Sequence, residues 1–227
     1  MPFAGKTVQD SLSIFFGNDP DILQDVQKAC TPVSFVNGAT ILAQEEESKT
    51  VYCIIAGTAK ALLYSEGGDE IWLDEFGPGA LFGEMAVLGS QIRTADIVAT
   101  SPVKVAAFSE ESFLSLMQKH GSIGIRVARM LVERIQQTTR RMFELSSLSA
   151  KGRVYAELLR LAKTDAHSKL LVIERLPSFT SFAQRISSTR ETVSRTVNEL
   201  ARLGYVSRTG KKLVVLMPEE IRNLQDW

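Results

Sequence analysis

Two charged residues stand near the ends of a short, mostly apolar segment. In FGEMAVLGSQIRTADI, which runs from Phe82 to Ile97, Glu84 and Arg93 are nine residues apart, and no other charge lies between them. Charged side chains are rarely buried without a partner. The spacing therefore predicts either a buried ion pair or two separate contacts with one small ligand. A buried ion pair alone would be weak evidence for function.

A second group of reactive side chains lies near the C-terminus. Ser178 or Thr180 can cap a short helix, and Thr189 can cap a second helix that ends at Gly204. Apolar residues are spaced to pack the two helices together: Phe182, Ala183, Ile186, Val193 and Val197. This pattern predicts a helix-turn-helix, whose second helix can enter the major groove of double-stranded DNA.

The outward face of that second helix carries side chains suited to DNA. Arg190 and Arg195 can donate to guanine, and Glu191 can accept from cytosine. Thr189 and Thr192 are placed for phosphates beside the helix N-terminus. The alternative is a solvated helix in which Glu191 and Arg195 form an ion pair one helical turn apart.

Two further features support a winged helix-turn-helix. The segments YVSR and KKLVVLM, with Thr209 and Gly210 between them, predict a β-hairpin wing. Ser187 occupies the turn position where such motifs usually have glycine. A non-glycine residue in a left-handed turn costs about 1 kcal/mol, so the turn is tolerable with serine.

The front of the chain must supply the elements that hold Glu84 and Arg93. From Pro32 to Phe108, short β runs such as VYCII, TAKALLY and DIVAT alternate with glycine-containing turns. Many short strands predict an antiparallel roll or barrel. A helix capped by Asp19 is expected before this region, and one capped by Ser109 after it.

A long helix is predicted from about Ile123 to Leu148. Its seam positions, three and four residues apart, are Ala128, Leu131, Ile135, Thr138, Met142 and Leu145. Such a repeat predicts a two-stranded coiled coil and therefore a homodimer. The Thr138 hydroxyl either bonds to its own helix or meets a polar group at the interface, and Thr139 is placed to reach the partner subunit. The hinge between domains is expected at Glu144–Ser149.

Composition narrows the class of protein. The 227 residues carry no net charge, but residues 1–147 hold 12 Lys and Arg against 18 Asp and Glu, and residues 148–227 hold 14 against 8. A basic back half predicts contact with a polyanion there. The sequence shows no signal peptide and no apolar run of about 20 residues, so we expect a cytoplasmic protein with no membrane contact.

Enzymatic activity is not expected. No nucleophile–base set, metal cluster or phosphate-binding loop appears, and the glycines of GPGALFG lack the dinucleotide-binding spacing. Cys30 and Cys53 are too few for a disulfide scaffold or an iron–sulfur cluster, and the two histidines, His120 and His167, lie outside the β region where a haem ligand would be needed. We expect no metal, haem or iron–sulfur cluster.

The order of these parts resembles the CRP/FNR family of bacterial transcription regulators. The resemblance covers nearly the whole chain and includes a β-roll, a long dimer helix and a winged helix-turn-helix reading RETVSR. FGEMAVLGSQIRTA is similar to the phosphate-binding cassette of cyclic-nucleotide-binding domains, although Ile92 stands where many relatives have proline. The resemblance implies an α+β protein that binds DNA and contacts RNA polymerase.

The resemblance also implies roles for particular residues. Arg93 and Thr94 would hold the cyclic phosphate together with the amides of Met85 and its neighbours, and Glu84 would accept from the ribose 2′-hydroxyl beside Gly83. The remaining contacts would come from Ala61 and Leu73 on the purine, Thr138 on its amino group and Thr139 of the other subunit.

Three expectations follow from the resemblance. The domains would be a nucleotide-binding roll (1–118), a dimerisation helix (119–148) and a DNA-binding domain (149–227). The ligand would be cAMP, with cGMP or both as the alternative, because the Thr94 hydroxyl can also face the 2-amino group of guanine. A ligand-independent DNA-binding dimer is the remaining alternative. Nucleotide binding would shift the dimer toward the state that binds a palindromic operator with a half-site resembling GTGA.

Overall fold

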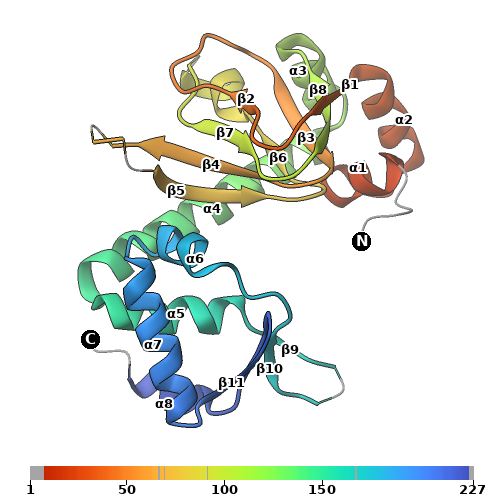
Figure 1. Cartoon of the computed structure of the whole chain (residues 1–227). Helices are drawn as coiled ribbons and strands as arrows, with labels where there is room; N and C mark the ends of the chain where they lie inside the picture. Colours follow the sequence, from red (N-terminus) through yellow and green to blue (C-terminus); the bar gives the residue numbers. More distant parts are fainter. Residues whose placement is uncertain (1–7, 66, 69, 91, 167, 225–227) are drawn as a thin grey trace. The chain divides into compact units, whose positions relative to one another are not determined.

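The computed structural model describes residues 8–65, 67–68, 70–90, 92–166 and 168–224. The chain forms two compact units, Met1–Glu133 and Arg134–Trp227. The division falls inside one helix and lies before the hinge predicted at Glu144–Ser149. Each unit has its own apolar core, and the two are described separately (Figure 1).

The first unit is an antiparallel β-roll with helices at its flanks. Its helices are α1 (Val8–Phe16), α2 (Pro20–Ala29), α3 (Glu110–Lys119) and the start of α4 (Gly121–Ser147), and the π-helical turn η1 spans Ala86–Ser90. Its strands are β1 (Thr31–Phe35), β2 (Thr40–Leu42), β3 (Val51–Ala56), β4 (Ala59–Tyr64), β5 (Glu70–Phe76), β6 (Leu81–Phe82), β7 (Asp96–Ala99) and β8 (Val103–Phe108). The predicted roll is confirmed.

Two four-stranded sheets make the roll, in the orders β1-β8-β3-β6 and β2-β7-β4-β5. Alternate side chains of these strands point inward and form a shared core that includes Ile54, Ala61, Phe82 and Val105. A second cluster lies where α1, α2, α3 and α4 cover the sheet that contains β3 and β8. The roll thus holds β6 and η1, which form the first part of the segment Phe82–Ile97, against its apolar core.

Local capping sets the helix boundaries. Asp19 accepts from the amides of Asp21 and Ile22 at the start of α2. Ser109 accepts from the amide of Ser112 at the start of α3. Both caps were predicted from the sequence, because a short polar side chain before the first turn satisfies an amide that has no partner in the helix.

Helix α4 is continuous across the division between the units. Its first turns pack Ile123 and Val127 into the second cluster, under α1, α2 and α3, and Leu131 is half-buried against the same cluster. Other large apolar side chains of α4 are exposed: Ile125, Val132, Ile135, Met142, Phe143 and Leu145. Five of the six predicted seam positions are exposed, and Leu131 is the exception because it packs against the core of the first unit.

The second unit is a winged helix-turn-helix. It comprises α5 (Ala150–Leu161), β9 (Lys163–Thr164), β10 (Leu171–Ile173), α6 (Phe179–Arg185), α7 (Arg190–Arg202), β11 (Val206–Thr209), β12 (Lys212–Val215) and α8 (Pro218–Asn223). The four strands form one sheet in the order β11-β12-β10-β9. The core joins α5, α6 and α7 through Leu158, Phe182 and Val197, among others. The predicted helix-turn-helix and β11–β12 hairpin are both present.

Among the described residues, no helix has the length and apolar character needed to cross a membrane.

Candidate functional site

The segment Phe82–Ile97, which carries Glu84 and Arg93, turns sharply at Gly83. Strand β6 ends at Phe82, Gly83 has a φ of +83°, and the chain then enters the helical turn that contains Glu84 and η1. A Cβ atom at Gly83 would lie 2.8 Å from the carbonyl oxygen of Thr50 and 2.9 Å from Nη1 of Arg93. Only glycine combines this φ with so close an approach, so the turn requires it.

Arg93 is buried and makes hydrogen bonds within the protein. Its Nη1 donates to the carbonyl oxygen of Gly83 at 2.7 Å, and its Nη2 donates to the carbonyl oxygen of Thr50 at 2.7 Å and to Oγ of Ser48 at 2.9 Å. The guanidinium therefore joins the turn after β6 to the segment that leads into β3. Ser48 and Thr50 are contacts that the sequence did not predict, since nothing in EEESKT marks them.

The Nε donor of Arg93 is not used in these bonds. Its Nε has no hydrogen-bond partner within the part of the chain that the structure describes. A buried N–H without a partner costs free energy, and an arginine N–H is well matched to a phosphate oxygen. Arg93 is thus fixed in place by its two terminal nitrogens while Nε keeps the capacity to donate to an anion.

The electrostatics of the site follow from burial. Burial lowers the pKa of Arg93, and the neighbouring Tyr52, Glu46 and Glu84 act in the opposite direction. Glu84 is fully buried. Its charge thus stabilises the charged form of Arg93, and an anionic ligand would stabilise that form further.

Thr94 lies beside Met85 on the exposed side of the segment. Its Oγ1 donates to Sδ of Met85 at 3.7 Å. A hydroxyl has one proton and two lone pairs, and a thioether is a weak acceptor. In this arrangement the Thr94 lone pairs are available to accept from an amino group. To donate to a phosphate, the Thr94 hydroxyl would have to give up its hydrogen bond to Met85.

Ala61 and Leu73 lie on neighbouring strands of the roll. Ala61 of β4 is buried in the core between the sheets, and Leu73 of β5 packs against the same cluster. The β4–β5 pairing shifts register between Ala61 and Leu62, so that Asp74 faces Ala61 and Trp72 faces Leu62. Leu73 is therefore the extra residue of a β-bulge, a feature that redirects side chains at such a site.

Thr138 and Thr139 are exposed on α4. They belong to the second unit, whereas Gly83, Glu84 and Arg93 belong to the first. Gly83, Glu84 and Arg93 therefore lie together in the first unit, whereas Thr138 and Thr139 lie in the second unit with the helix-turn-helix.

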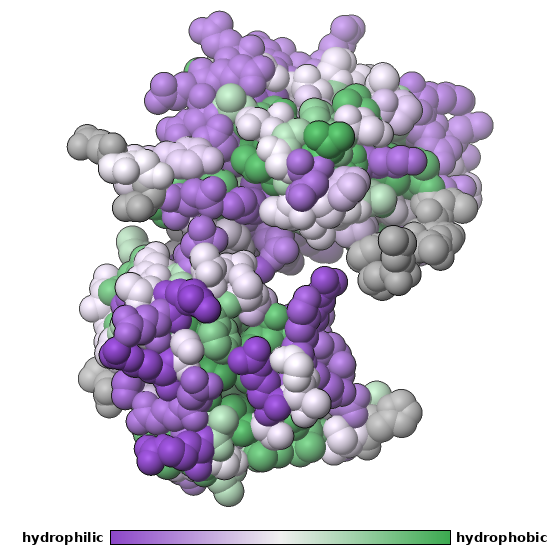
Figure 2. All heavy atoms as spheres, in the orientation of Figure 1, coloured by the Kyte–Doolittle hydropathy of each residue, from purple (hydrophilic) through white to green (hydrophobic). Residues whose placement is uncertain are grey.

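The predicted DNA-binding face is formed by α7. Thr189 caps this helix by accepting from the amide of Thr192 at 3.1 Å. Arg190, Glu191 and Arg195 are exposed, and Glu191 forms an ion pair with Arg195. Hydrophilic side chains cover the outward surface along α7 (Figure 2). The ion pair that the sequence offered as the alternative is present, and it leaves both side chains in solvent.

Arg153, which the sequence did not single out, makes hydrogen bonds to the turn before α7. Ser187 has a φ of +49°, the strained conformation expected at this position. From α5, Arg153 donates through Nε to the carbonyl oxygen of Ile186 at 2.9 Å and through Nη2 to that of Ser187 at 3.1 Å. Its Nη1 donates to the carbonyl oxygen of Leu148 at 3.0 Å.

Comparison with known proteins agrees with this architecture. Residues 32–120 match the cyclic nucleotide-binding domain, and residues 152–224 match the Crp-like helix-turn-helix domain. The two domains define a class, that of DNA-binding transcription regulators with a cyclic nucleotide-binding domain, and not an enzyme. Within that class, the chain belongs to the CRP/FNR family.

Two curated relatives cover most of the chain. It is 30% identical over 192 residues to the cAMP-activated global transcriptional regulator CRP of Pasteurella multocida, covering 82% of this chain and 90% of the relative. It is 27% identical over 211 residues to the CRP-like cAMP-activated global transcriptional regulator of Mycobacterium tuberculosis, covering 92% and 94%. The c-di-GMP responsive global regulator CLP of Xanthomonas campestris has a TM-score of 0.72 at 21% identity over 87% of this chain and 99% of that chain, which shows a shared fold.

Proposed function

We propose that this regulator is a homodimer that cAMP activates and that then binds a palindromic operator in double-stranded DNA, where it contacts RNA polymerase. The observation that carries the nucleotide part is the buried Arg93, whose Nε has no partner among the described residues while its terminal nitrogens are held by the roll. The names of the two curated relatives support cAMP in particular.

The site residues fit a cyclic nucleotide. Arg93 would hold the phosphate through Nε, with the amides of the turn after Gly83 beside it. Glu84 would accept from the ribose 2′-hydroxyl. The purine would contact the side of the roll that carries Ala61 and Leu73, and the exposed Thr138 and Thr139 would close the site, with Thr139 reaching the other subunit.

One observation favours cGMP, or response to both nucleotides, as the second candidate. The Thr94 hydroxyl donates to Met85, which leaves its lone pairs able to accept from the 2-amino group of guanine. Adenine lacks that amino group. Thr94 and Met85 would therefore decide the preference between the two nucleotides.

The exposed stripe of α4 supports the homodimer. Ile125, Val132, Ile135 and Met142 are exposed, three to seven residues apart along one helix. A second copy of the helix would bury this surface as a two-stranded coiled coil. The dimer would present two copies of α7 to half-sites about one helical turn apart, roughly 34–36 Å.

The dimer can be tested by a charge placed on the stripe. We expect Ile135→Glu to dissociate it in analytical ultracentrifugation, because each subunit would bring a carboxylate into an apolar seam. Gln137→Glu is the control, since it adds the same charge at an exposed position away from the stripe. An Ile135→Glu protein that sediments like the parent chain would place the dimer interface elsewhere.

The function is tested by a DNA-binding titration with cAMP, with cGMP and without nucleotide, together with calorimetry of each nucleotide. We expect heat of binding and a tighter operator complex with cAMP. A response only to cGMP would favour the second candidate. Operator binding that neither nucleotide changes, with no heat from either, would overturn nucleotide control and leave a ligand-independent DNA-binding dimer.

A further inference from the structure

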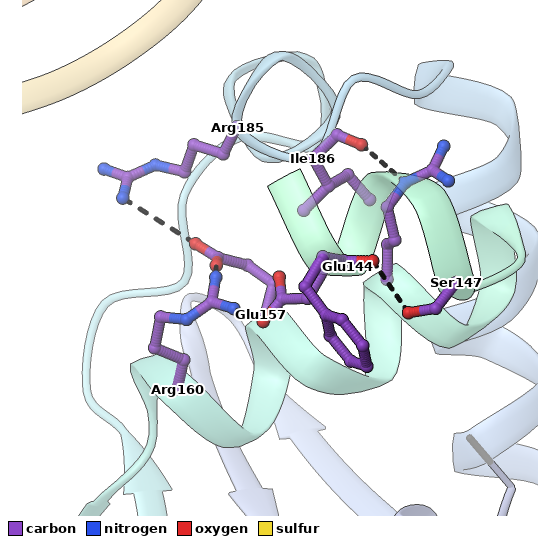
Figure 3. A network of polar contacts seen from close by, with 8 residues as sticks. Glu144, Ser147, Glu157, Arg160, Arg185 and Ile186 are labelled. Carbon is purple, nitrogen blue, oxygen red and sulfur yellow. Dashed lines mark hydrogen bonds and ion pairs between the residues drawn. The ribbon is translucent and has the colours of Figure 1, made fainter. Parts of the chain in front are cut away.

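A chain of charged side chains connects the end of α4 to the helix-turn-helix. Arg160 of α5 donates to the carboxylates of both Glu144, on the last turns of α4, and Glu157, on its own helix. Glu157 in turn lies 3.8 Å from Nη1 of Arg185 at the end of α6, measured from its Oε1. Figure 3 shows these four side chains converging from three helices.

The centre of this chain is buried. The Glu157 side chain is 4% exposed, and its burial raises the pKa of the carboxyl, while Arg160 and Arg141 act to lower it. For Arg160, burial acts to lower the pKa, but the hydrogen bond to Glu144 and the charge of Glu157 outweigh it. Glu157 is the deeply buried member, whereas Arg160 keeps 33% of its side chain exposed. Removing a partner of Glu157 would leave its buried charge uncompensated, which favours a fixed geometry around it.

Arg153 makes a second connection between the same elements. It donates to the carbonyl oxygen of Leu148, just beyond α4, and to those of Ile186 and Ser187 in the turn between α6 and α7. Arg153 and Arg160 lie seven residues apart on α5, so both project from one side of that helix. The junction between α4 and α5 is thus held at two positions. Arg160 donates to the Glu144 carboxylate, and Arg153 donates to the carbonyl oxygen of Leu148.

The second half of α4 belongs to the same compact unit as these contacts. The part of α4 from Arg134 onward groups with the DNA-binding domain and not with the roll. The exposed Thr138 and Thr139 lie in that part, roughly one and a half turns before Glu144. Whatever contacts those threonines therefore acts on a segment that is already joined to the recognition domain.

We infer that Glu144 and Arg160 are positioning residues for the nucleotide response: their ion pair makes the second half of α4 a rigid extension of the helix-turn-helix, so that ligand contact at α4 reorients α7. This inference rests on the proposed function and specifies how its two sites are coupled. The competing arrangement is a flexible α4–α5 joint, in which the pair contributes only to stability.

The two arrangements differ in the coupling factor, the ratio of operator Kd without cAMP to that with cAMP. Coupling between two sites is reciprocal, so the same factor must appear as tighter cAMP binding to the protein–DNA complex. We expect Glu144→Gln, which keeps the shape and removes the charge, to lower this factor about fivefold, within the usual range of such couplings. Its cAMP Kd without DNA should stay within about twofold of the parent value.

Two further variants make the test specific. Arg160→Lys keeps the positive charge beside Glu157 but cannot offer a planar fork to two carboxylates, so we expect it to fold and to lose coupling as well. Glu133→Gln makes the same change as Glu144→Gln at an exposed α4 position in the first unit and should keep the parent coupling factor.

The outcomes separate the inference from the proposed function. If Glu144→Gln and Arg160→Lys lower the melting temperature but keep the parent coupling factor in both directions, the pair is merely structural and the inference is overturned. If the parent chain itself shows no effect of cAMP or cGMP on operator binding, the proposed function fails and the inference fails with it. Loss of coupling in both variants with unchanged cAMP affinity supports the inference.

Discussion

Gly83→Ala is the sharpest test of the nucleotide site. At a φ of +83° an alanine costs about 1–2 kcal/mol more than glycine. Its Cβ would also lie 2.8 Å from the Thr50 carbonyl oxygen and 2.9 Å from Nη1 of Arg93, so the guanidinium must move and weaken its hydrogen bond to the Gly83 carbonyl oxygen. A hydrogen bond to a charged group contributes about 1.5–3 kcal/mol. The free energy of unfolding should fall by roughly 2.5–5 kcal/mol in total.

For a chain of this size, that loss corresponds to a melting temperature lower by roughly 10 °C. Because displacement of the guanidinium also turns Nε away, we expect cAMP affinity to fall at least about tenfold. Differential scanning calorimetry and isothermal titration would measure the two effects. Gly89→Ala is the matched control, since Gly89 lies six residues further on in η1, has no positive φ, and a Cβ there would meet nothing within 4 Å.

Gly89→Ala should therefore resemble the parent chain in both measurements. A Gly83→Ala protein with the parent melting temperature would show that the turn tolerates a Cβ and would refute the strain argument. A Gly83→Ala protein with a lower melting temperature but the parent cAMP affinity would refute the role given to Arg93. Displacement of the Arg93 guanidinium must affect both stability and cAMP binding.

Three further predictions concern the ligand, the DNA and the pH response. Thr94→Val should weaken cGMP binding several-fold more than cAMP binding in parallel titrations, and an equal loss for both would assign the Thr94 hydroxyl to the phosphate. Arg190→Ala should weaken operator binding by about 1–3 kcal/mol in a fluorescence titration, and unchanged affinity would remove Arg190 from base recognition. The hydrogen bonds that Asp25 makes with Lys119 and His120 lower the pKa of its carboxyl. The stability from this group is present above its unfolded pKa and is lost as the pH falls through the folded pKa, so thermal unfolding should show the parent chain losing stability below about pH 4 and Asp25→Asn losing less. Parallel pH curves for the two proteins would contradict this.

Local signals explain why much of the fold was predictable. Asp19, Ser109 and Thr189 each cap a helix because a side-chain oxygen reaches an amide two or three residues ahead. Ser187 takes the left-handed conformation that the length of the turn between two packed helices imposes. Such features depend on neighbours in the sequence, so the sequence alone predicts them.

Contacts between distant segments were not predictable in the same way. The hydrogen bonds of Arg93 join it to Ser48 and Thr50, more than forty residues earlier. Apolar spacing along α4 does not show that Leu131 packs against the second cluster of the first unit, because that depends on how the helix meets the roll. Arg153 and Arg160 are ordinary surface arginines in the sequence, and only the fold gives them their acceptors.

The hydrogen bonds of Arg153 to the turn before α7 have a consequence for how operator preference could change. All three of its acceptors are main-chain carbonyl oxygens, of Leu148, Ile186 and Ser187. A main-chain acceptor is present whatever side chain the residue carries. The contacts that hold the turn before α7 therefore do not depend on the side chains proposed to read the bases, and exchanging Arg190 or Glu191 removes no acceptor of Arg153.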